Sequence, residues 1–217
     1  MAKKENTDIQ LDLFSPSFAH GIAIKDQQDI MRYPFFSLSK SKRITPIEYD
    51  DGTNKVFITG ADYGIANIFD LDILIYAASQ IAKAQNEGLE VSPHFEVSAY
   101  DMLTFLGKST GGKEYKRLKS SMRRLHATTI TTTIRSEDNI RYEGGFHWID
   151  QWKSVEKNGK GIAIRFKLSD WIYRGIVNQK FILTVDREFL KIESGLERFL
   201  YRLCRKVVGK QPRAIWR

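Results

Sequence analysis

The stretch GGKEYKRLKSSMRRLH, residues 111–126, decides the fold that we expect for this chain. Apolar residues recur there every three or four positions, which predicts one buried helix face: Tyr115, Leu118, Met122 and Leu125. At about 100° per residue the opposite face carries cations, namely Lys113, Lys116, Arg117, Lys119, Arg123 and Arg124. A charged helix face is most often simply solvated. Because these charges share one sign and the neighbouring segments fit a DNA-binding motif, we favour DNA recognition.

The segments around this basic helix complete the motif. Residues 98–106 predict a shorter helix, residues 107–112 a glycine-containing turn, and the Thr-rich residues 128–134 a strand. Helix, turn, basic helix and hairpin follow one another in this order in a winged helix-turn-helix. We expect DNA contacts from the turn, the basic helix and the strands after it: Lys108, Ser109, Thr110, Lys113, Lys116, Arg117, Ser120, Arg123, Arg124, Arg135 and Arg141.

The composition favours a polyanionic partner. The chain has 217 residues and a net charge of +8, and the cations are concentrated around the basic helix. It has a single cysteine, Cys204, so no disulfide framework is expected. No apolar run approaches the roughly 20 residues that span a bilayer, and the N-terminus lacks a secretory signal. We therefore expect a cytoplasmic protein without a membrane partner.

The sequence contains no set of residues that predicts catalysis. Its four histidines are scattered and lack the spacing of a metal-ligand pair. The residues Gly107-Lys108-Ser109-Thr110 are similar to part of a nucleotide-binding loop. That motif, however, needs a glycine where Met102 stands and a strand where a helix is expected. We therefore expect no enzymatic activity, no cofactor and no metal site.

The remaining segments predict an α+β fold. Residues 70–86 predict a largely buried helix with Asp70 as its N-cap. Residues 128–135, 140–152 and 162–168 predict a three-stranded antiparallel meander, and either hairpin tip could be the wing. Three tryptophans in and after the meander are expected in the core: Trp148, Trp152 and Trp171.

Residues 195–208 predict an amphipathic helix whose apolar side needs a partner. That side comprises Leu196, Phe199, Leu200, Leu203 and Val207. We expect the helix to pack on the preceding domain or to mediate self-association, so that the chain is a monomer or a homodimer.

From residue 32 to residue 216 the chain resembles the plasmid replication initiator protein A family. Five stretches in matching order carry the resemblance: PFFSLSKSKRITPIEY (34–49), YGIANIFDLDILIYAASQI (63–81), TGGKEYKRLKSSMRRLHATTI (110–130), FHWIDQW (146–152) and LERFLYRLCRKVVGKQ (196–211). The resemblance implies tandem winged-helix domains that bind repeated sites in a plasmid origin. It also implies that they help to melt neighbouring A·T-rich DNA and recruit the host initiator and helicase machinery.

The resemblance sets the expected domain organisation. Residues 1–31 are expected to form a flexible tail, and residues 32–180 a first winged-helix domain whose helix-turn-helix spans 98–126. Residues 181–217 are expected to be the truncated start of a second winged-helix domain.

The expected tail contains Gln10-Leu11-Asp12-Leu13-Phe14, which resembles the peptide by which bacterial replication proteins bind the polymerase sliding clamp. Leu13 and Phe14 would fill an apolar pocket, while the Gln10 amide forms hydrogen bonds nearby and Leu11 lies between. The segment could instead fold back onto the domain as a short helix or strand. In a replication initiator we favour the host sliding clamp as its partner.

Three classes of function compete. The leading one is a plasmid initiator that binds tandem repeats in the origin, helps to open it and also represses its own promoter. The alternative is a winged-helix transcriptional repressor, which would bind an inverted repeat over a promoter. A nickase or nuclease is disfavoured, because the metal-ligand pair that such enzymes need is missing from the sequence.

Overall fold

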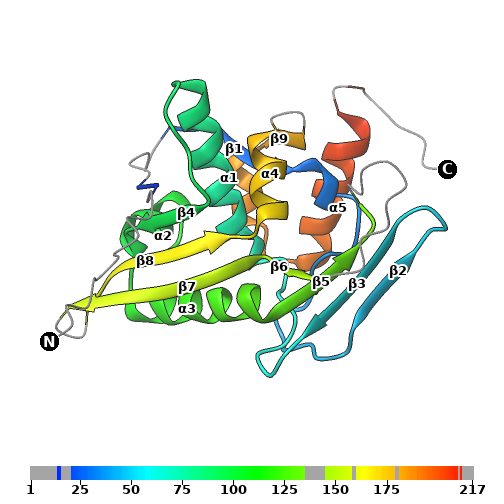
Figure 1. Cartoon of the computed structure of the whole chain (residues 1–217), viewed down its shortest axis with the longest axis horizontal. Coiled ribbons are helices and arrows are strands. Elements are labelled where there is room, and N and C mark those ends of the chain that lie inside the picture. Colours follow the sequence, from blue (N-terminus) through cyan, green and yellow to red (C-terminus); the bar gives the residue numbers. More distant parts are fainter. Residues whose placement is uncertain are drawn as a thin grey trace, which may run out of the picture.

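The computed structural model describes residues 14–15, 21–134, 145–157, 160–178, 181–209 and 211, and it has the α+β composition expected from the sequence (Figure 1). The helices are α1 (Leu71–Asn86), α2 (Ala99–Phe105), α3 (Gly112–Ala127), α4 (Asp170–Val177) and α5 (Gly195–Val208), with short 3₁₀ helices η1 (Gln28–Ile30) and η3 (Arg187–Lys191). The strands are β1 (Ile24–Gln27), β2 (Ile47–Asp50), β3 (Lys55–Gly60), β4 (His94–Val97), β5 (Thr128–Thr132), β6 (Phe146–His147), β7 (Ile149–Lys157), β8 (Lys160–Leu168) and β9 (Ile182–Val185). They form three antiparallel sheets, in the orders β1-β9, β2-β3-β5-β6 and β4-β8-β7.

One part of the chain has the element order of a winged helix. α1, β4, α2, α3, β7 and β8 occur in this order, with β5 and β6 of another sheet between α3 and β7, and the last sheet combines the three strands among them. Phe95 of β4 stacks on Phe166 of β8 with 4.8 Å between ring centroids, and both rings are buried. α3 lies along the lower edge of Figure 1, next to β7. The β7–β8 hairpin beside α3 therefore takes the position of the wing.

The predicted three-stranded meander is wrong, because its first strand belongs to a different sheet from the other two. β5 pairs with β3 and β6, whereas β7 pairs with β8. Within the described residues, the strand predicted at 140–152 is interrupted at Trp148, whose buried ring stacks on Phe36 with 4.6 Å between centroids. The chain passes from one sheet to the other at this residue. Alternation along a strand reports which side chains face the core, but it does not report such a change of sheet.

The helices lie where the sequence predicts them, but one predicted cap is wrong. Ser98 caps α2, and Gly107, with φ of +65°, follows the end of that helix. Asp70 does not cap α1. Its carboxylate instead accepts hydrogen bonds from the Asn67 backbone N–H and from the Arg124 guanidinium. Arg124 of α3 therefore binds the carboxylate oxygens that would otherwise accept hydrogen bonds from the first N–H groups of α1.

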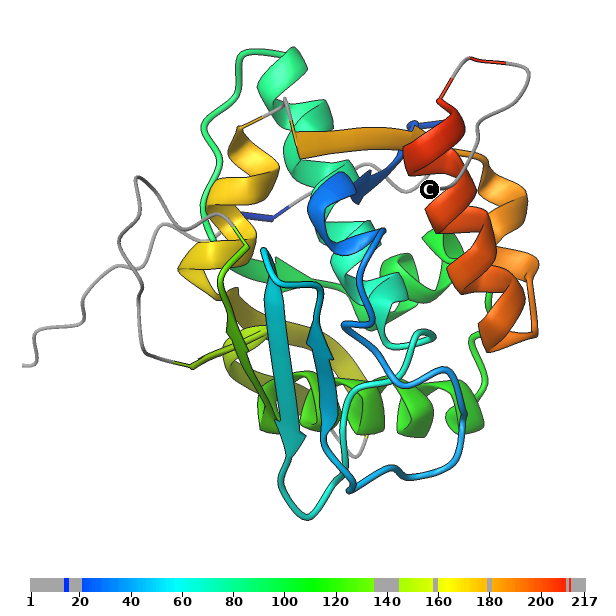
Figure 2. The same cartoon turned by 90° about the vertical axis from the view of Figure 1, so that its right-hand side faces the viewer.

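Residues 21–31 are part of the fold, which differs from the flexible tail predicted for 1–31. β1 pairs with β9, with Ile24 opposite Val185, and both side chains are buried. Ile30 and Met31 are buried as well. Figure 2 shows β1 and β9 beside α1. Because this pairing joins segments far apart in the sequence, the polar composition around β1 gives no local sign of it.

α5 packs on the preceding domain, with Phe199 against the core, but two of its arginines are buried more deeply than its predicted apolar residues. Arg198 and Arg202 are 0% and 1% exposed. Each forms an ion pair with N–O distance 2.6 Å, Arg198 with Asp72 of α1 and Arg202 with Asp26 of β1. The apolar residues that face solvent instead are Leu196, 56% exposed, and Leu200, 45% exposed.

Residues 181–209 are thus joined to the rest of the fold through the β1–β9 pairing and two buried ion pairs. Gly195 lies so close to the Leu38 carbonyl that a Cβ there would stand 1.9 Å from its oxygen, so only glycine permits this contact. The division of the chain at residue 181 into two winged-helix units stays a prediction.

Candidate nucleic-acid interface

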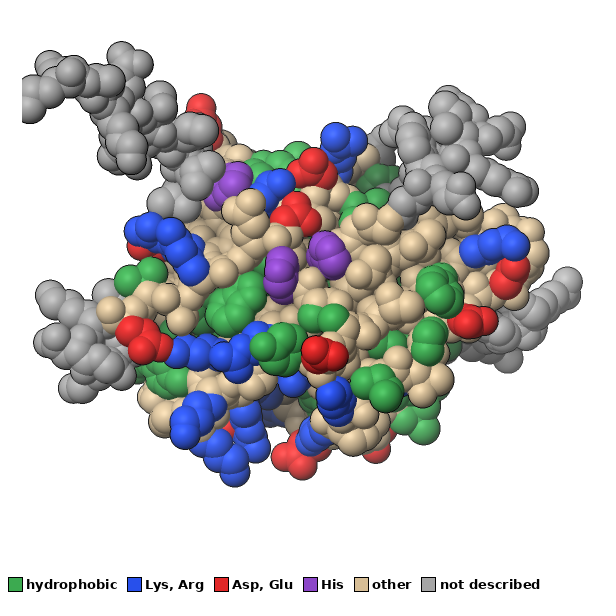
Figure 3. All heavy atoms as spheres, turned by 60° about the horizontal axis from the view of Figure 1, so that its bottom comes forward, with side chains coloured by type: hydrophobic (Ala, Val, Ile, Leu, Met, Phe, Trp, Pro, Cys, Tyr) green, Lys and Arg blue, Asp and Glu red, His purple; other side chains and the backbone are tan. Residues whose placement is uncertain are grey.

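α3 has a buried apolar side and an exposed basic side, as the sequence predicts. Leu118, Met122 and Leu125 are buried, and Tyr115 packs against the core. The cations exposed to solvent are Lys113, Lys116, Arg117 and Arg123. Figure 3 shows Lys and Arg side chains gathered on one half of the face that includes α3. We call these four residues the basic ridge of α3.

Two cations of α3 are held by neighbouring elements and are not part of this ridge. Arg124 donates hydrogen bonds of 2.7 and 2.6 Å to the buried Asp70 carboxylate, and these bonds raise the pKa of the Arg124 guanidinium. Lys119 forms an ion pair with Glu156 near the end of β7. The sequence predicts a DNA contact for Arg124, but its side chain links α3 to the start of α1.

The turn before α3 presents backbone and hydroxyl groups to solvent. Ser109, Thr110 and Gly112 are exposed, and the open space around Gly112 would accommodate a Cβ without contact. The N-cap position of α3 is Gly111, which has no side chain with which to cap the helix. Backbone N–H groups at an uncapped helix N-terminus favour anions, so this end of α3 suits a phosphate. Ser120, in the middle of α3, donates its hydroxyl hydrogen to the Lys116 carbonyl.

A cleft of 1010 Å³ lies on one side of α3, between this helix, the start of α1, the α2–α3 turn and residues 187–193. Cations line both of its walls: Lys40, Lys108, Lys113, Arg117, Arg187 and Lys191. Of the acids that line it, Asp70, Asp72 and Glu114 each form an ion pair with a cation. The cleft therefore continues the positive charge of the basic ridge towards η3.

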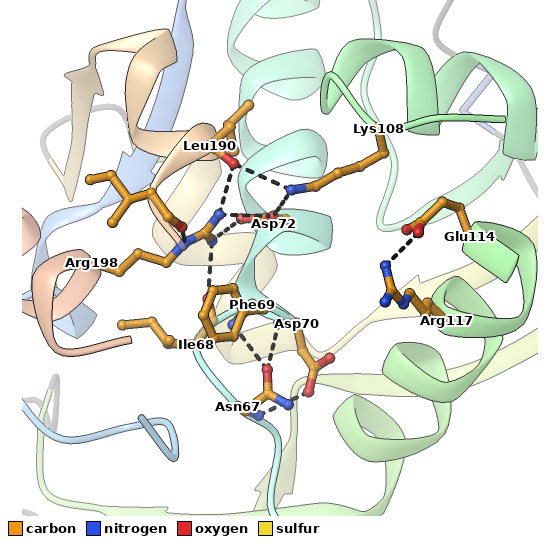
Figure 4. A network of polar contacts seen from close by, with 11 residues as sticks. Asn67, Ile68, Phe69, Asp70, Asp72, Lys108, Glu114, Arg117, Leu190 and Arg198 are labelled. Atoms are coloured by element: carbon orange, nitrogen blue, oxygen red, sulfur yellow. Dashed lines mark hydrogen bonds and ion pairs between the residues drawn. The ribbon is translucent and has the colours of Figure 1, made fainter. Parts of the chain in front are cut away.

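Lys108, another predicted DNA contact, takes part in a buried network that reaches α5 (Figure 4). Its ammonium donates to the Leu190 carbonyl at 3.3 Å and lies 3.8 Å from the Asp72 carboxylate. Arg198 donates to the same carbonyl at 2.9 Å and packs against the Phe69 ring. Burial raises the pKa of the Asp72 carboxyl, and the Arg198 guanidinium opposes that shift. Lys108 thus ties the α2–α3 turn to residues 190–198.

Several predicted site residues lie outside the described residues. These are Arg135, Arg141, Gln10, Leu11 and Leu13. Phe14 is described: its N–H donates to the His94 carbonyl at 2.7 Å, and its carbonyl accepts from the Glu96 N–H at 3.1 Å. Its ring meets Phe95 edge-on with 5.1 Å between centroids. Phe14 therefore extends the sheet at β4, in line with the alternative that this segment folds back.

The structure brings together residues that the sequence did not connect. His126 and His147 lie with ring centroids 5.8 Å apart, and each Nδ1 atom is paired with a backbone carbonyl. Tyr63, from the loop before α1, lies 5.9 Å from the guanidinium of Arg123. Pairing across so many residues leaves no local signal in the sequence.

Among the described residues, no three His, Cys, Asp or Glu side chains gather as a metal site would require.

A sequence model described as "Replication initiator protein A" matches residues 25–217. The chain belongs to the replication initiator protein A family. This confirms the resemblance found in the sequence.

Within the described residues, no helix combines the length and apolar character needed to cross a membrane.

The comparison with individual proteins agrees with the family. A "Putative replication protein" of Wigglesworthia glossinidia brevipalpis is 34% identical over 187 residues, which cover 83% of this chain and 66% of that protein. The chain thus spans just under two thirds of that relative's length. Domains 2 and 3 of RctB have a similar fold, with a TM-score of 0.59 at 14% identity, covering 82% of this chain and 70% of that one. A second crystal structure of the same RctB domains gives a TM-score of 0.58.

Proposed function

We propose that the chain initiates plasmid replication by binding repeated sequences in the plasmid origin with α3 in the major groove. On this proposal the bound protein helps to open the origin, recruits the host initiator and helicase machinery, and represses its own promoter. Membership of the replication initiator protein A family supports the initiation role. The observation that carries the DNA-binding role is the basic ridge of α3, whose cations are exposed and whose Lys113, Lys116 and Arg117 line the cleft.

The geometry of α3 suits the major groove. A groove about 12 Å wide admits one α-helix, and α3 exposes the uncapped N-terminus and the cations that such a helix uses. Arg117 and Arg123 can each donate two hydrogen bonds to a guanine edge, worth about 1–3 kcal/mol of discrimination per contact. Lys113 and Lys116 suit phosphates, which fix the register of the helix without reading sequence.

A transcriptional repressor is the alternative interpretation of the same surface. An initiator binds tandem direct repeats in the origin, whereas a dimeric repressor binds an inverted repeat whose symmetry matches its own. The arrangement of the protected sites therefore separates the two functions.

The test is a fluorescence anisotropy titration with two labelled duplexes, one from the origin of the chain's own plasmid and one of scrambled sequence. We expect tighter binding to the origin duplex, and we expect Arg117→Ala or Arg123→Ala to reduce that preference. Lys113→Ala should weaken binding to both duplexes alike and lower the dependence of log K on log salt by about 0.9. Equal affinity of the intact chain and the arginine variants for both duplexes would refute specific recognition by α3.

We also propose that residues 10–14 bind the host polymerase sliding clamp. Phe14 already occupies a site on β4, so clamp binding requires that its two backbone hydrogen bonds be released. The binding free energy must offset this release together with the ordering of the segment, so we expect an affinity in the micromolar range.

A further inference from the structure

A second exposed surface lies beside the C-terminal half of α3. We call it the flank patch, and it comprises Lys42, Arg43, Ile44 and Tyr63, with Arg123 of the basic ridge beside Tyr63. We propose that the flank patch binds the sugar–phosphate backbone of the same duplex, beside the groove that α3 enters. This inference rests on the proposed function and adds a second contact surface to it.

Close backbone packing holds the two loops of the patch together. Ile65 donates its N–H to the Arg43 carbonyl at 2.8 Å. Gly64 has φ of +82°, and a Cβ there would lie 2.9 Å from both the Arg43 carbonyl oxygen and the Lys42 Cγ atom. A larger residue at position 64 would therefore force the loops apart. Residues 42–44 and 61–64 thus form one surface rather than two independent loops.

The same surface is attached to α3. The Ala61 N–H donates to the carbonyl of Ala127, the last residue of α3, at 3.3 Å. The Arg123 guanidinium lies 5.9 Å from the Tyr63 ring, within reach of a cation–π contact. The patch therefore stands at a fixed place relative to the basic ridge.

The side chains of the patch suit a nucleic acid backbone. Lys42 and Arg43 are exposed, and the Arg43 guanidinium donates to the carbonyls of Thr45 and Pro46, which fixes its position. Tyr63 is 57% exposed, and Ile44 is 66% exposed. Cations contact phosphates, a tyrosine hydroxyl can donate to a phosphate oxygen, and apolar groups can pack on deoxyribose. Ile44 and Tyr63 thus add apolar surface beside Lys42 and Arg43, and the loop of Tyr63 also exposes Asp62.

The length of α3 places this patch over a phosphate strand. Sixteen residues at 1.5 Å per residue make a helix of about 24 Å, roughly twice the width of the major groove. When α3 crosses the groove at an angle, its last turn reaches the groove edge, next to the loop that the Ala61–Ala127 hydrogen bond attaches to it. The C-terminal end of a helix carries partial negative charge, which repels phosphate. Lys42 and Arg43 supply positive charge that offsets this repulsion.

The experiment compares the double variant Lys42→Ala/Tyr63→Ala with a matched control, Lys83→Ala/Leu89→Ala. The control also removes one lysine and one large exposed side chain, but at the other end of the fold, around the end of α1. Both are surface changes, so the unfolding temperatures should stay close to that of the intact chain. Affinity for the origin duplex is measured by anisotropy at several salt concentrations.

We expect the flank variant to bind about tenfold more weakly, and the control to bind like the intact chain. The dependence of log K on log salt should fall by about 0.9 for each phosphate that the flank variant no longer neutralises. Duplexes shortened stepwise from either end give a second readout. Removing the base pairs under the patch should weaken the intact chain but leave the flank variant unchanged.

Three outcomes would overturn the inference. The flank variant could match the control in affinity and salt dependence while Lys113→Ala/Lys116→Ala binds weakly, in which case the proposed function stands without this patch. It could instead keep its DNA affinity but lose self-association in sedimentation, which would make the patch a protein interface. If the intact chain itself fails to bind origin DNA, the proposed function fails together with this inference.

Discussion

Arg124 of α3 donates two hydrogen bonds, of 2.7 and 2.6 Å, to the carboxylate of Asp70 at the start of α1. Arg123, the adjacent residue, is exposed and belongs to the basic ridge. Two neighbouring arginines in one helix thus face different partners. The pair Arg124–Asp70 fixes α3 against α1, while Arg123 is available to a ligand.

The first prediction separates these two arginines. Arg124→Ala removes the cation that pairs with Asp70, which is 1% exposed, and should destabilise the protein by about 3 kcal/mol. In a chain of this size that lowers the unfolding temperature by roughly 6–12 °C. Arg123→Ala should change stability by less than about 0.5 kcal/mol but weaken DNA binding. Thermal unfolding and anisotropy on both variants check this, and similar stability of the two would contradict the assignment.

The second prediction concerns the buried pair Arg198–Asp72. Asp72→Asn leaves the guanidinium without its counter-charge and should cost about 3–5 kcal/mol. The double variant Asp72→Leu/Arg198→Met replaces the pair by apolar groups and should recover much of that loss. Denaturant unfolding of both variants measures the difference. A double variant no more stable than the single one would show that the pair contributes through more than its mutual charge.

The third prediction tests the orientation of α5. Leu200→Gln should leave the free energy of unfolding nearly unchanged, because Leu200 is largely exposed, whereas Arg202→Leu should destabilise by stranding the buried Asp26. An α5 with its leucines inward would give the opposite ranking. Sedimentation at rising concentration of the intact chain and Leu200→Gln also tests whether the exposed leucines mediate self-association.

The fourth prediction concerns the sliding clamp. In a calorimetric titration the intact chain should bind the host clamp in the micromolar range, and Leu13→Ala/Phe14→Ala should not bind while its DNA affinity stays unchanged. Clamp binding should also speed hydrogen exchange at the Phe14 amide, because that amide would leave the His94 carbonyl. No binding at tens of micromolar, or equal binding by the variant, would make the motif a coincidence.

The sequence predicted the helices and their ends correctly where these depend on the spacing of residues a few positions apart. The stripe Leu118/Met122/Leu125 predicted both the position of α3 and its buried side, because residues three and four apart lie on one helix face. Ser98 and Gly107 likewise act on their own helix within a few residues. The basic ridge could be predicted from the same periodicity.

The sequence was misleading where a residue distant in the sequence determines which contact a side chain makes. Asp70 is of a residue type that often caps helices, but its carboxylate accepts a hydrogen bond from Arg124, which lies 54 residues later in the chain. The leucines of α5 mark an apolar side, yet the aspartates at positions 26 and 72 draw the arginines of α5 inward. A helical wheel shows which residues share a face, but charges elsewhere in the fold decide which face is buried.

The most direct test of origin binding through α3 is footprinting of the intact chain and the triple variant Lys113→Ala/Lys116→Ala/Arg123→Ala on the origin of its own plasmid. We predict protection of tandem direct repeats by the intact chain, and none by a variant that unfolds at the same temperature. No protection by the intact chain, or the same protection by a folded triple variant, would contradict origin binding through α3.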